Sequence, residues 1–522
     1  MARRIKALYF SRQEKLDTAM SLASRLAKGA SITFTGLLIS KFIAFFYRIT
    51  VGRGLGPEQY GYLTLGIASF FLAQNLSNIS VDEAIERYVP ENRERTSRYL
   101  YSALRVSLPL SILAAAVMFI FAEQLVALAN MSSEMTSVIR IMAIGVPFGV
   151  ASSSLNSVFV AHEKIRYQVY GNQIYQNIFK LLSGITALAL GLGLWGVTWG
   201  FTLSVITSVM LTAYYLKTRM NLSLPEDTNS RKIVKYSWPL FFSGLMGFVL
   251  SWTDTIMIGY FTGSGAQIGI YNAAFPLART LTIFMGATTT IAFPIMSKLH
   301  GENRKKEMKK LYQTNTRWVL MFATPAFLIM ALFPEEILHL TFGREYLPAA
   351  NTLRILSAGM FAGTLVGPTG VILKSTDNQK YTMYNSVFTT AANVLMNVAL
   401  IPVFGILGAA YASIASSLIG NFAGAAESYI EEGIHAFHTG LMPIAVSSLT
   451  SLAATYAGLK LVQPVTPLWT LVPGAAVFGA IYIILLVMMG GIKEDDRDII
   501  VGAGKKIDME EEAEKIADTV IR

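Results

Sequence analysis

The sequence predicts an all-α polytopic membrane protein with about fourteen transmembrane helices, and three observations predict it. Of the 522 residues, 53% are hydrophobic and only 15% are charged, whereas roughly a quarter of the residues of a typical soluble domain are charged. The mean hydropathy is +0.47. Apolar runs of about 20 residues, long enough to cross a hydrocarbon core as a helix, recur along the whole chain. The third observation is an internal repeat of six runs.

The apolar runs define the expected spans. The first follows a long polar segment rich in Arg and Lys and precedes many further runs, so we expect it to remain in the membrane and not to be a cleaved signal peptide. The fourteen spans are 29–51, 59–81, 99–122, 138–161, 167–190, 195–216, 236–260, 267–295, 315–334, 350–373, 381–402, 406–428, 439–461 and 468–490.

The distribution of Lys and Arg predicts the orientation. These residues gather in the N-terminal tail and in the loops that follow even-numbered spans, as in 90–101 and 301–312. Loops rich in Lys and Arg stay on the cytoplasmic side. We therefore expect a multi-pass protein of the cell membrane with both termini in the cytoplasm. The loop 427–438 lacks both residue types, so the orientation of span 13 is the least strongly predicted.

Several segments of the first half recur in the second half. Gln59 and Gly61 correspond to Gln267 and Gly269, 208 positions later. Further matching segments are PENRERTSRYLY (90–101) with GENRKKEMKKLY (301–312), VIRIMAIG (138–145) with TLRILSAG (352–359), and GLWGVTW (193–199) with GILGAAY (405–411). Matches at nearly one shift indicate that spans 1 to 6 repeat as spans 7 to 12.

A repeat of six spans crosses the membrane an even number of times, so its two copies are parallel and related by an axis along the membrane normal. Such folds carry substrate between the halves and rock one against the other. Spans 13 and 14 have no counterpart. The expected organisation is a cytoplasmic amphipathic tail (1–28), an N-lobe (29–222), a C-lobe (231–430), two accessory helices (438–490) and a charged cytoplasmic tail (491–522).

Two segments carry a family resemblance. RITVGRGLGPEQYGYLTL (48–65) and DTIMIGYFTGSGAQIGIYNAAFPLAR (254–279) resemble the corresponding segments of polysaccharide-biosynthesis flippases in the multidrug/oligosaccharidyl-lipid/polysaccharide exporter superfamily. The resemblance implies that the chain moves lipid-linked oligosaccharides across the cytoplasmic membrane, with a glycan on polyprenyl phosphate or pyrophosphate as the substrate.

Three cations lie near the middle of predicted spans, namely Lys41, Lys180 and Arg279. A charge at the bilayer centre costs about 2.5 to 3.5 kcal/mol on insertion scales, and it persists only where it faces protein or water. We interpret the three as the lining of a central cavity that holds the phosphate of the carrier lipid. The alternative is that they only hold helices together.

Other polar residues extend this candidate substrate-binding set. Arg48 lies seven residues after Lys41, hence on the same helix face, while Gln173 and Asn177 share a stripe with Lys180 in span 5. Arg48 could instead extend toward the outer interface. Similar stripes follow span 2 (Gln74, Asn78, Asp82) and span 11 (Asn385, Thr389, Asn393, Asn397).

Asp254 is the acidic residue well inside span 7, near its outer end. Carboxylates within the membrane often take part in proton or ion relays. Asp254 is therefore a candidate for binding a coupling ion, Na⁺ or H⁺, or for an ion pair with Arg48 that supports or gates the fold. The glycines of span 10, from Gly359 to Gly370, are candidate hinges.

The sequence argues against several other functions. GLGLWG (191–196) joins two membrane spans and no strand, so it fails as a dinucleotide site, and the chain has no Walker sequence and no cysteine. His435 and His438 fit a solvated turn better than a metal site. We expect a monomer that is not an enzyme, needs no cofactor and binds no nucleic acid. The main competing function is a cation-coupled multidrug or metabolite antiporter of the same superfamily.

Overall fold

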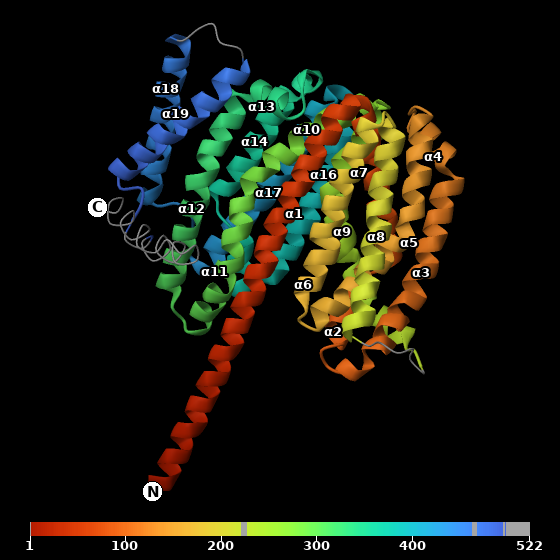
Figure 1. The fold of residues 1–522 in the computed structure, drawn as a ribbon. Helices are drawn as coiled ribbons and strands as arrows, with labels where there is room; N and C mark the ends of the chain where they lie inside the picture. The colour runs from red at the N-terminus through yellow and green to blue at the C-terminus, as the bar shows by residue number, and fades with distance from the viewer. Residues whose placement is uncertain (1, 221–226, 462–466, 494–495, 497–522) are drawn as a thin grey trace. The chain divides into compact units, whose positions relative to one another are not determined.

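A computed structural model describes residues 2–220, 227–461, 467–493 and 496 of the chain, and these residues form helices joined by turns and loops, with no strand among them (Figure 1). The chain divides into two compact units. Unit 1 comprises Met1–Trp252 with Gly263–Ala266, and unit 2 comprises Thr253–Thr262 with Gln267–Arg522.

Unit 1 contains the first eight α-helices and most of the ninth. The long helix α1 bends at Gly56, whose φ of 74° lies in the left-handed region, next to Pro57. A proline inside a helix breaks its hydrogen bonding, so expected spans 1 and 2 are the two arms of α1. The elements of unit 1 are α1 (Ala2–Asn78), α2 (Val81–Tyr88), η1 (Arg93–Arg95), α3 (Thr96–Ile120), α4 (Ala122–Leu128), α5 (Glu134–Ala161), α6 (Ile165–Gln168), η2 (Val169–Tyr175), α7 (Gln176–Ala189), α8 (Gly193–Met220) and α9 (Ser230–Thr262).

Unit 2 contains the end of α9 and the remaining helices. Its elements are α10 (Gly265–Arg279), η3 (Thr280–Thr282), α11 (Ile283–Gly301), α12 (Lys305–Leu332), α13 (Pro334–Thr341), η4 (Arg344–Ala349), α14 (Ala350–Leu365), α15 (Thr369–Ser375), α16 (Gln379–Phe404), α17 (Ile406–Glu432), η5 (Thr439–Leu441), α18 (Met442–Leu461) and α19 (Pro467–Met488). The accessory helices α18 and α19 pack on α12. Tyr482 of α19, for example, donates a hydrogen bond to the carbonyl of Met321 at 2.9 Å.

Nine helices of the described residues are long and apolar enough to cross a membrane. They match expected spans 3, 4, 6, 7 and 9 to 13. The remaining expected spans lie on the bent helix α1 (spans 1 and 2), on interrupted helices (spans 5 and 8) and on α19 (span 14). The chain is therefore an all-helical, multi-pass membrane protein, and the count of fourteen remains a prediction.

The N-terminal tail was expected to be an amphipathic helix on the inner surface. In the structure, α1 runs without a break from Ala2 through the first span. The side chains of residues 2–35 lie outside the described part of the chain, as does most of the charged tail 491–522, so the placement of both tails remains a prediction.

Three expected spans are interrupted where polar residues cluster. Span 5 contains the π-helical turn η2, span 8 changes to a 3₁₀ turn directly after Arg279, and span 10 breaks between α14 and α15. Neither π-helical nor 3₁₀ turns are common inside helices, and both often mark functional positions. From the sequence, each of these three spans is expected to be continuous.

The break in span 10 depends on Gly367. Its φ is 72°, and a Cβ there would lie 2.3 Å from Thr316 Oγ1, while Tyr312 donates a hydrogen bond to the neighbouring carbonyl of Val366. We expect Gly367→Ala to destabilise the protein by about 1–3 kcal/mol, because alanine is strained at this φ. Gly370→Ala, where a Cβ meets nothing within 4 Å, is the matched control. Thermal unfolding in detergent measures both, and equal unfolding temperatures for the two variants would contradict the expectation.

The first half of α9 packs within unit 1, beyond the end of the expected N-lobe at residue 222. Ile233 is fully buried in one cluster with Val81 and Tyr99. Asp227, three residues before α9 begins, forms an ion pair with Arg98 at 2.7 Å. Hydrophobic burial of this kind is the largest stabilising contribution to packing. The main segment of unit 1 therefore ends at Trp252, whereas the predicted N-lobe ends at residue 222.

Some contacts recur at repeat-related positions. Arg140 donates to the carbonyl of Phe119 and pairs with Glu123, and its counterpart Arg354 donates to the carbonyl of Ala331 and pairs with Glu335. The acids and carbonyls that these arginines contact are themselves 212 positions apart. The same interaction therefore joins the third and fourth helices of each half.

A second recurrence concerns the helix-connecting turns. Gly193 and Gly405 have φ values of 53° and 57°, which favour glycine. A Cβ on Gly193 would lie 3.9 Å from Gln59 Oε1, and one on Gly405 would lie 3.0 Å from Gln267 Oε1. Both members of each contact come from the segments that match in sequence.

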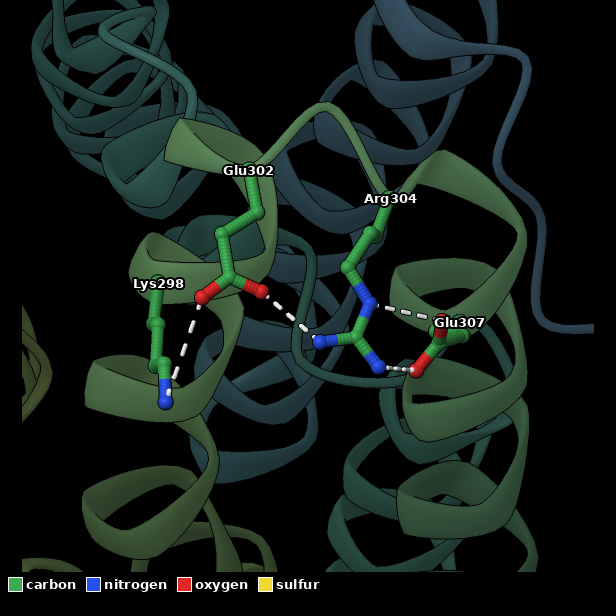
Figure 2. A network of polar contacts seen from close by, with 4 residues as sticks. All are labelled: Lys298, Glu302, Arg304 and Glu307. Atoms are coloured by element: carbon green, nitrogen blue, oxygen red, sulfur yellow. Dashed lines mark hydrogen bonds and ion pairs between the residues drawn. The ribbon is translucent and has the colours of Figure 1, made fainter.

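The loop between α11 and α12 carries a network of charged residues, shown in Figure 2. Arg304 lies between Glu302, at 2.7 Å, and Glu307, while Lys298 lies 3.9 Å from Glu302. The hydrogen bond from Arg304 lowers the pKa of Glu307. Exposed pairs of this kind contribute little to stability. The network leaves this basic loop well defined in solvent.

We expect this loop to face the cytoplasm. A single cysteine at Asn303 should not react with an impermeant maleimide added to intact cells, whereas one at Ser132, in a loop without Lys or Arg, should react. The native chain has no cysteine, so each label reports one site. The reverse pattern would overturn the predicted orientation.

Candidate functional site

The cations of unit 1 meet aromatic side chains. Lys180, on α7, is half-buried, and its Nζ lies 4.9 Å from the ring centroid of Tyr47 and 5.9 Å from that of Phe201. Arg48 follows Tyr47 on α1 and lies close enough to Lys180 for the two charges to interact. An ammonium over a ring face is stabilised by the negative potential of the ring. The aromatic rings thus hold Lys180 within the helices and leave its N–H groups available to an anion.

Asn177 and Gln173 lie close to this group and bridge two helices. Asn177 Nδ2 donates to Ser40 Oγ on α1 at 2.9 Å and to the carbonyl of Gln173 at 2.7 Å, and Ser40 Oγ donates to the same carbonyl at 3.2 Å. Gln173 belongs to the π-helical turn, which leaves its carbonyl free to accept these bonds. The nitrogen of Asn177 therefore serves the fold, and its Oδ1 remains as a possible acceptor for a ligand.

The predicted stripe in span 5 is altered by the same turn. A π-helical turn has more residues than an α-helical turn, so Gln173 does not keep the α-helical spacing to Lys180 that the sequence suggested. Gln173 and Asn177 remain neighbours, because both are hydrogen-bonded to Ser40. Sequence periodicity assumes a regular helix and does not reveal the π-helical turn.

Two predicted site residues are exposed. Lys41 lies on α1, two turns before Arg48, and Arg279 lies at the end of α10 in unit 2, where the helix changes to η3. Both lie on expected spans, and within a membrane an exposed charge must reach water, a headgroup or a ligand. Arg279 belongs to a different unit from the other three cations, so a single patch that unites them remains a proposal.

Asp254 lies in a buried cluster of neutral hydrogen-bond donors. Its Oδ1 accepts from Asn397 Nδ2 at 2.8 Å and Asn393 Nδ2 at 3.2 Å, and its Oδ2 accepts from the Tyr271 hydroxyl at 2.5 Å and from the Ser413 hydroxyl. Asp254 is only 8% exposed. Four donors from α10, α16 and α17 thus converge on one carboxylate in the second half of α9.

This cluster has the chemistry of a small-cation site. Asn397 is fully buried, and its Oδ1 lacks a hydrogen-bond partner among the described residues. Carboxylate, amide and hydroxyl oxygens are suitable ligands for a hard cation. The described residues include no group of three or more His, Cys, Asp or Glu that could hold a metal ion, so a candidate ion would depend on one carboxylate and neutral oxygens.

The sequence pattern identified some of these residues and missed others. It identified Asp254 and the stripe containing Asn393 and Asn397, and it missed Tyr271 and Ser413. Tyr271 lies within the GIYNAA segment that carries the family resemblance, which could have indicated it. Ser413 gave no signal, because serine on an apolar helix is usually bonded to its own helix.

Comparisons with known proteins place the chain among membrane transporters. A family model described as "Polysaccharide biosynthesis protein" matches residues 26–300, and one described as MatE matches residues 239–399. A protein of Methanocaldococcus jannaschii, "Uncharacterized membrane protein MJ1068", is 23% identical over 76% of this chain and 82% of its own length.

Two further similarities concern flippases. The "Probable low-salt glycan biosynthesis flippase Agl15" of Haloferax volcanii is 26% identical over 212 residues, which are 40% of this chain and 45% of that protein. Among solved structures, "Lipid II flippase MurJ, inward closed conformation" has a TM-score of 0.70 at 16% identity, covering 91% of this chain and 100% of that one. The fold is therefore shared over nearly the whole length.

Proposed function

The chain belongs to the polysaccharide biosynthesis protein family, and on that premise we propose that it is a flippase for lipid-linked oligosaccharide or polysaccharide precursors. It moves the glycan of a polyprenyl phosphate or pyrophosphate across the cytoplasmic membrane. The observation that carries this proposal is the cationic group of unit 1, in which Lys180 lies over the rings of Tyr47 and Phe201 with Arg48 nearby.

The architecture proposed for this transport is two parallel six-helix halves within fourteen spans. The recurrent contacts support the repeat, because Arg140 binds a carbonyl of α3 and a glutamate of α4, and Arg354 binds a carbonyl of α12 and a glutamate of α13. Parallel halves related by an axis along the membrane normal can rock against each other and so expose a shared site to each side in turn. The extra helices α18 and α19 stay with unit 2 through α12.

The proposed substrate site combines Lys41, Lys180 and Arg279 at the phosphate end of the lipid. Arg binds two phosphate oxygens at once, while Lys acts as a point charge. Arg48 adds a further charge. Gln173 and Asn177 accept hydrogen bonds from sugar hydroxyls through their side-chain oxygens, and Gln173 Oε1 has no partner among the described residues.

Asp254 couples transport to Na⁺ or H⁺ in this proposal. The support is its burial and its four neutral donors, with the unpartnered oxygen of Asn397 beside it. An ion pair with Arg48 is the alternative role. Both roles concern the same carboxylate, and a double-mutant cycle distinguishes them, as set out in the Discussion.

An antiporter for cationic drugs or metabolites is the second candidate function, because the MatE model matches residues 239–399. The midplane charges favour an anionic substrate instead, since Lys41, Lys180 and Arg279 would repel a cation.

Purified protein in liposomes tests the two functions directly. A fluorescent polyprenyl pyrophosphate-sugar in the bilayer is bleached by dithionite from outside, and we expect the flippase to expose the inner-leaflet fraction. Ethidium efflux is measured in parallel. Protein that exports ethidium but leaves the inner-leaflet lipid protected would be an antiporter and would contradict the flippase function.

A further inference from the structure

We propose that the contact face between α16 and α17 is the route by which a monovalent cation passes between the cytoplasmic side and Asp254, with Glu427 as an intermediate carboxylate. The inference rests on the ion coupling proposed for Asp254. It assigns a binding role to Glu427, which lies outside the set of residues that the sequence pattern selected.

The route consists of a ladder of polar side chains on one ridge of α16. Its members follow each other at intervals of four residues: Tyr381, Asn385, Thr389, Asn393 and Asn397. Residues four apart form one of the ridges by which helices pack, and α16 packs along α17. The ladder therefore lies in the contact between these two helices.

The opposite helix supplies the partners. Tyr381 donates to Glu431 Oε1 at 2.6 Å, and Asn385 Nδ2 donates to Glu427 Oε2 at 2.6 Å. At the other end, Asn397 donates to Asp254 at 2.8 Å. Three carboxylates thus lie along the same ladder. Glu431 is at its cytoplasmic end, Glu427 is one turn further into the helices, and Asp254 is at its buried end.

Burial increases along the ladder toward Asp254. Tyr381, Asn385 and Thr389 are half-buried, Asn393 is 5% exposed and Asn397 is fully buried. From Tyr381 to Asn397 the ladder rises about 24 Å at the rise of an α-helix, which is most of a hydrocarbon core of about 30 Å. The gradient is that of a path from solvent to an enclosed site.

Two glycines on α17 lie directly against the middle of the ladder. A Cβ on Gly420 would lie 2.3 Å from Thr389 Oγ1, and one on Gly424 would lie 2.8 Å from Thr369 Oγ1 and 3.7 Å from Asn385 Nδ2. Side chains at these positions would occupy the space beside the ladder. Small residues also allow helices to pack closely, so the experiment must separate passage of a cation from packing alone.

Silver ion is a suitable probe, because it is a small monovalent cation that binds thiols tightly. Thr389→Cys and Val387→Cys are made separately in the cysteine-free chain; Val387 is 52% exposed on another face of α16. In inside-out vesicles, reaction with Ag⁺ is measured as the loss of later labelling by maleimide. We expect this loss to be about tenfold faster at Thr389→Cys than at Val387→Cys, because a bare cation avoids hydrocarbon. Equal rates at the two cysteines would overturn the route.

Glu427→Gln tests the carboxylate itself. Glutamine can still accept the hydrogen bond from Asn385 but carries no charge, so a packing role predicts no change. We expect the Ag⁺ rate at Thr389→Cys to fall about tenfold, because the negative charge attracts cations locally. An unchanged rate would show that Glu427 is structural.

Gly420→Ala tests the space along the path, with Gly479→Ala as the control, since a Cβ at Gly479 meets nothing within 4 Å. We expect Gly420→Ala alone to slow Ag⁺ modification of Thr389→Cys, with unfolding temperatures of both variants measured alongside. Equal modification rates in the two variants would contradict a path past Gly420.

Ion binding is measured separately, as the rise in unfolding temperature with NaCl against choline chloride and with pH, because a ligand of the folded state stabilises it. Glu427→Gln should keep this rise and Asp254→Asn should lose it. If the wild type shows no rise with either ion, the coupling at Asp254 fails and the route fails with it. If the rise is present but the Ag⁺ rates are equal, only the route is wrong.

Discussion

Neutralising Lys41, Lys180 and Arg279 together should reduce flipping of a polyprenyl pyrophosphate-sugar to the rate of protein-free liposomes. Each single neutral variant should lose about tenfold or more, because a hydrogen bond to a charged group contributes about 1.5–3 kcal/mol. The three residues lie on α1, α7 and α10. The dithionite assay measures the loss at equal amounts of inserted protein.

The control for this variant removes the same number of positive charges outside the spans, at the exposed residues Lys217, Arg231 and Lys306. It should flip at the wild-type rate. Arg279→Lys should restore only part of the activity if two-point contact with phosphate matters, since lysine cannot form it. Wild-type flipping by the triple neutral variant would show that the cations are structural and that the proposed phosphate site is wrong.

Replacing Asp254 by asparagine should abolish the dependence of flipping on a Na⁺ or H⁺ gradient while leaving binding of the lipid substrate largely intact. Asparagine keeps one side-chain oxygen for Tyr271 or Asn397 but removes the charge that attracts a cation. Initial flipping rates with and without each gradient, and lipid binding measured at equilibrium, separate the two effects.

The alternative role of Asp254 gives a different result. If Asp254 pairs with Arg48, then Asp254→Asn should lower the unfolding temperature, and the further change Arg48→Gln should partly restore it, because it removes the unpaired charge. Groups that interact are non-additive in a double-mutant cycle, whereas distant groups add. Additive effects together with an unchanged ion dependence would contradict both roles.

Tyr271→Phe is the matched control for the carboxylate cluster. It removes one of the four donors to Asp254 and keeps the charge. We expect it to weaken but not abolish the ion dependence. Loss of ion dependence equal to that of Asp254→Asn would show that the geometry of the cluster, as well as the charge of Asp254, is required.

The sequence by itself determined the class of fold and the positions of most helices. Apolar runs must become helices in a membrane, since lipid offers no partner for backbone groups, and each helix from α3 onward that is long enough to span lies on an expected run. The repeat was also visible in the sequence, because the matching residues serve the same helix ends, as Arg140 and Arg354 do. Asp254 was identified by its charge alone.

Only the tertiary structure decided how the polar residues are grouped. Helical periodicity relates residues on one helix, but the partners of Asp254 come from α10, α16 and α17, and no spacing in the sequence indicates which helices pack together. The π-helical turn at Gln173 and the break at Gly367 likewise depend on bonds from Ser40 and Tyr312 on other helices. Hydropathy is a property of single residues, whereas a hydrogen-bonded site requires side chains that the packing of separate helices brings within about 3 Å of one another.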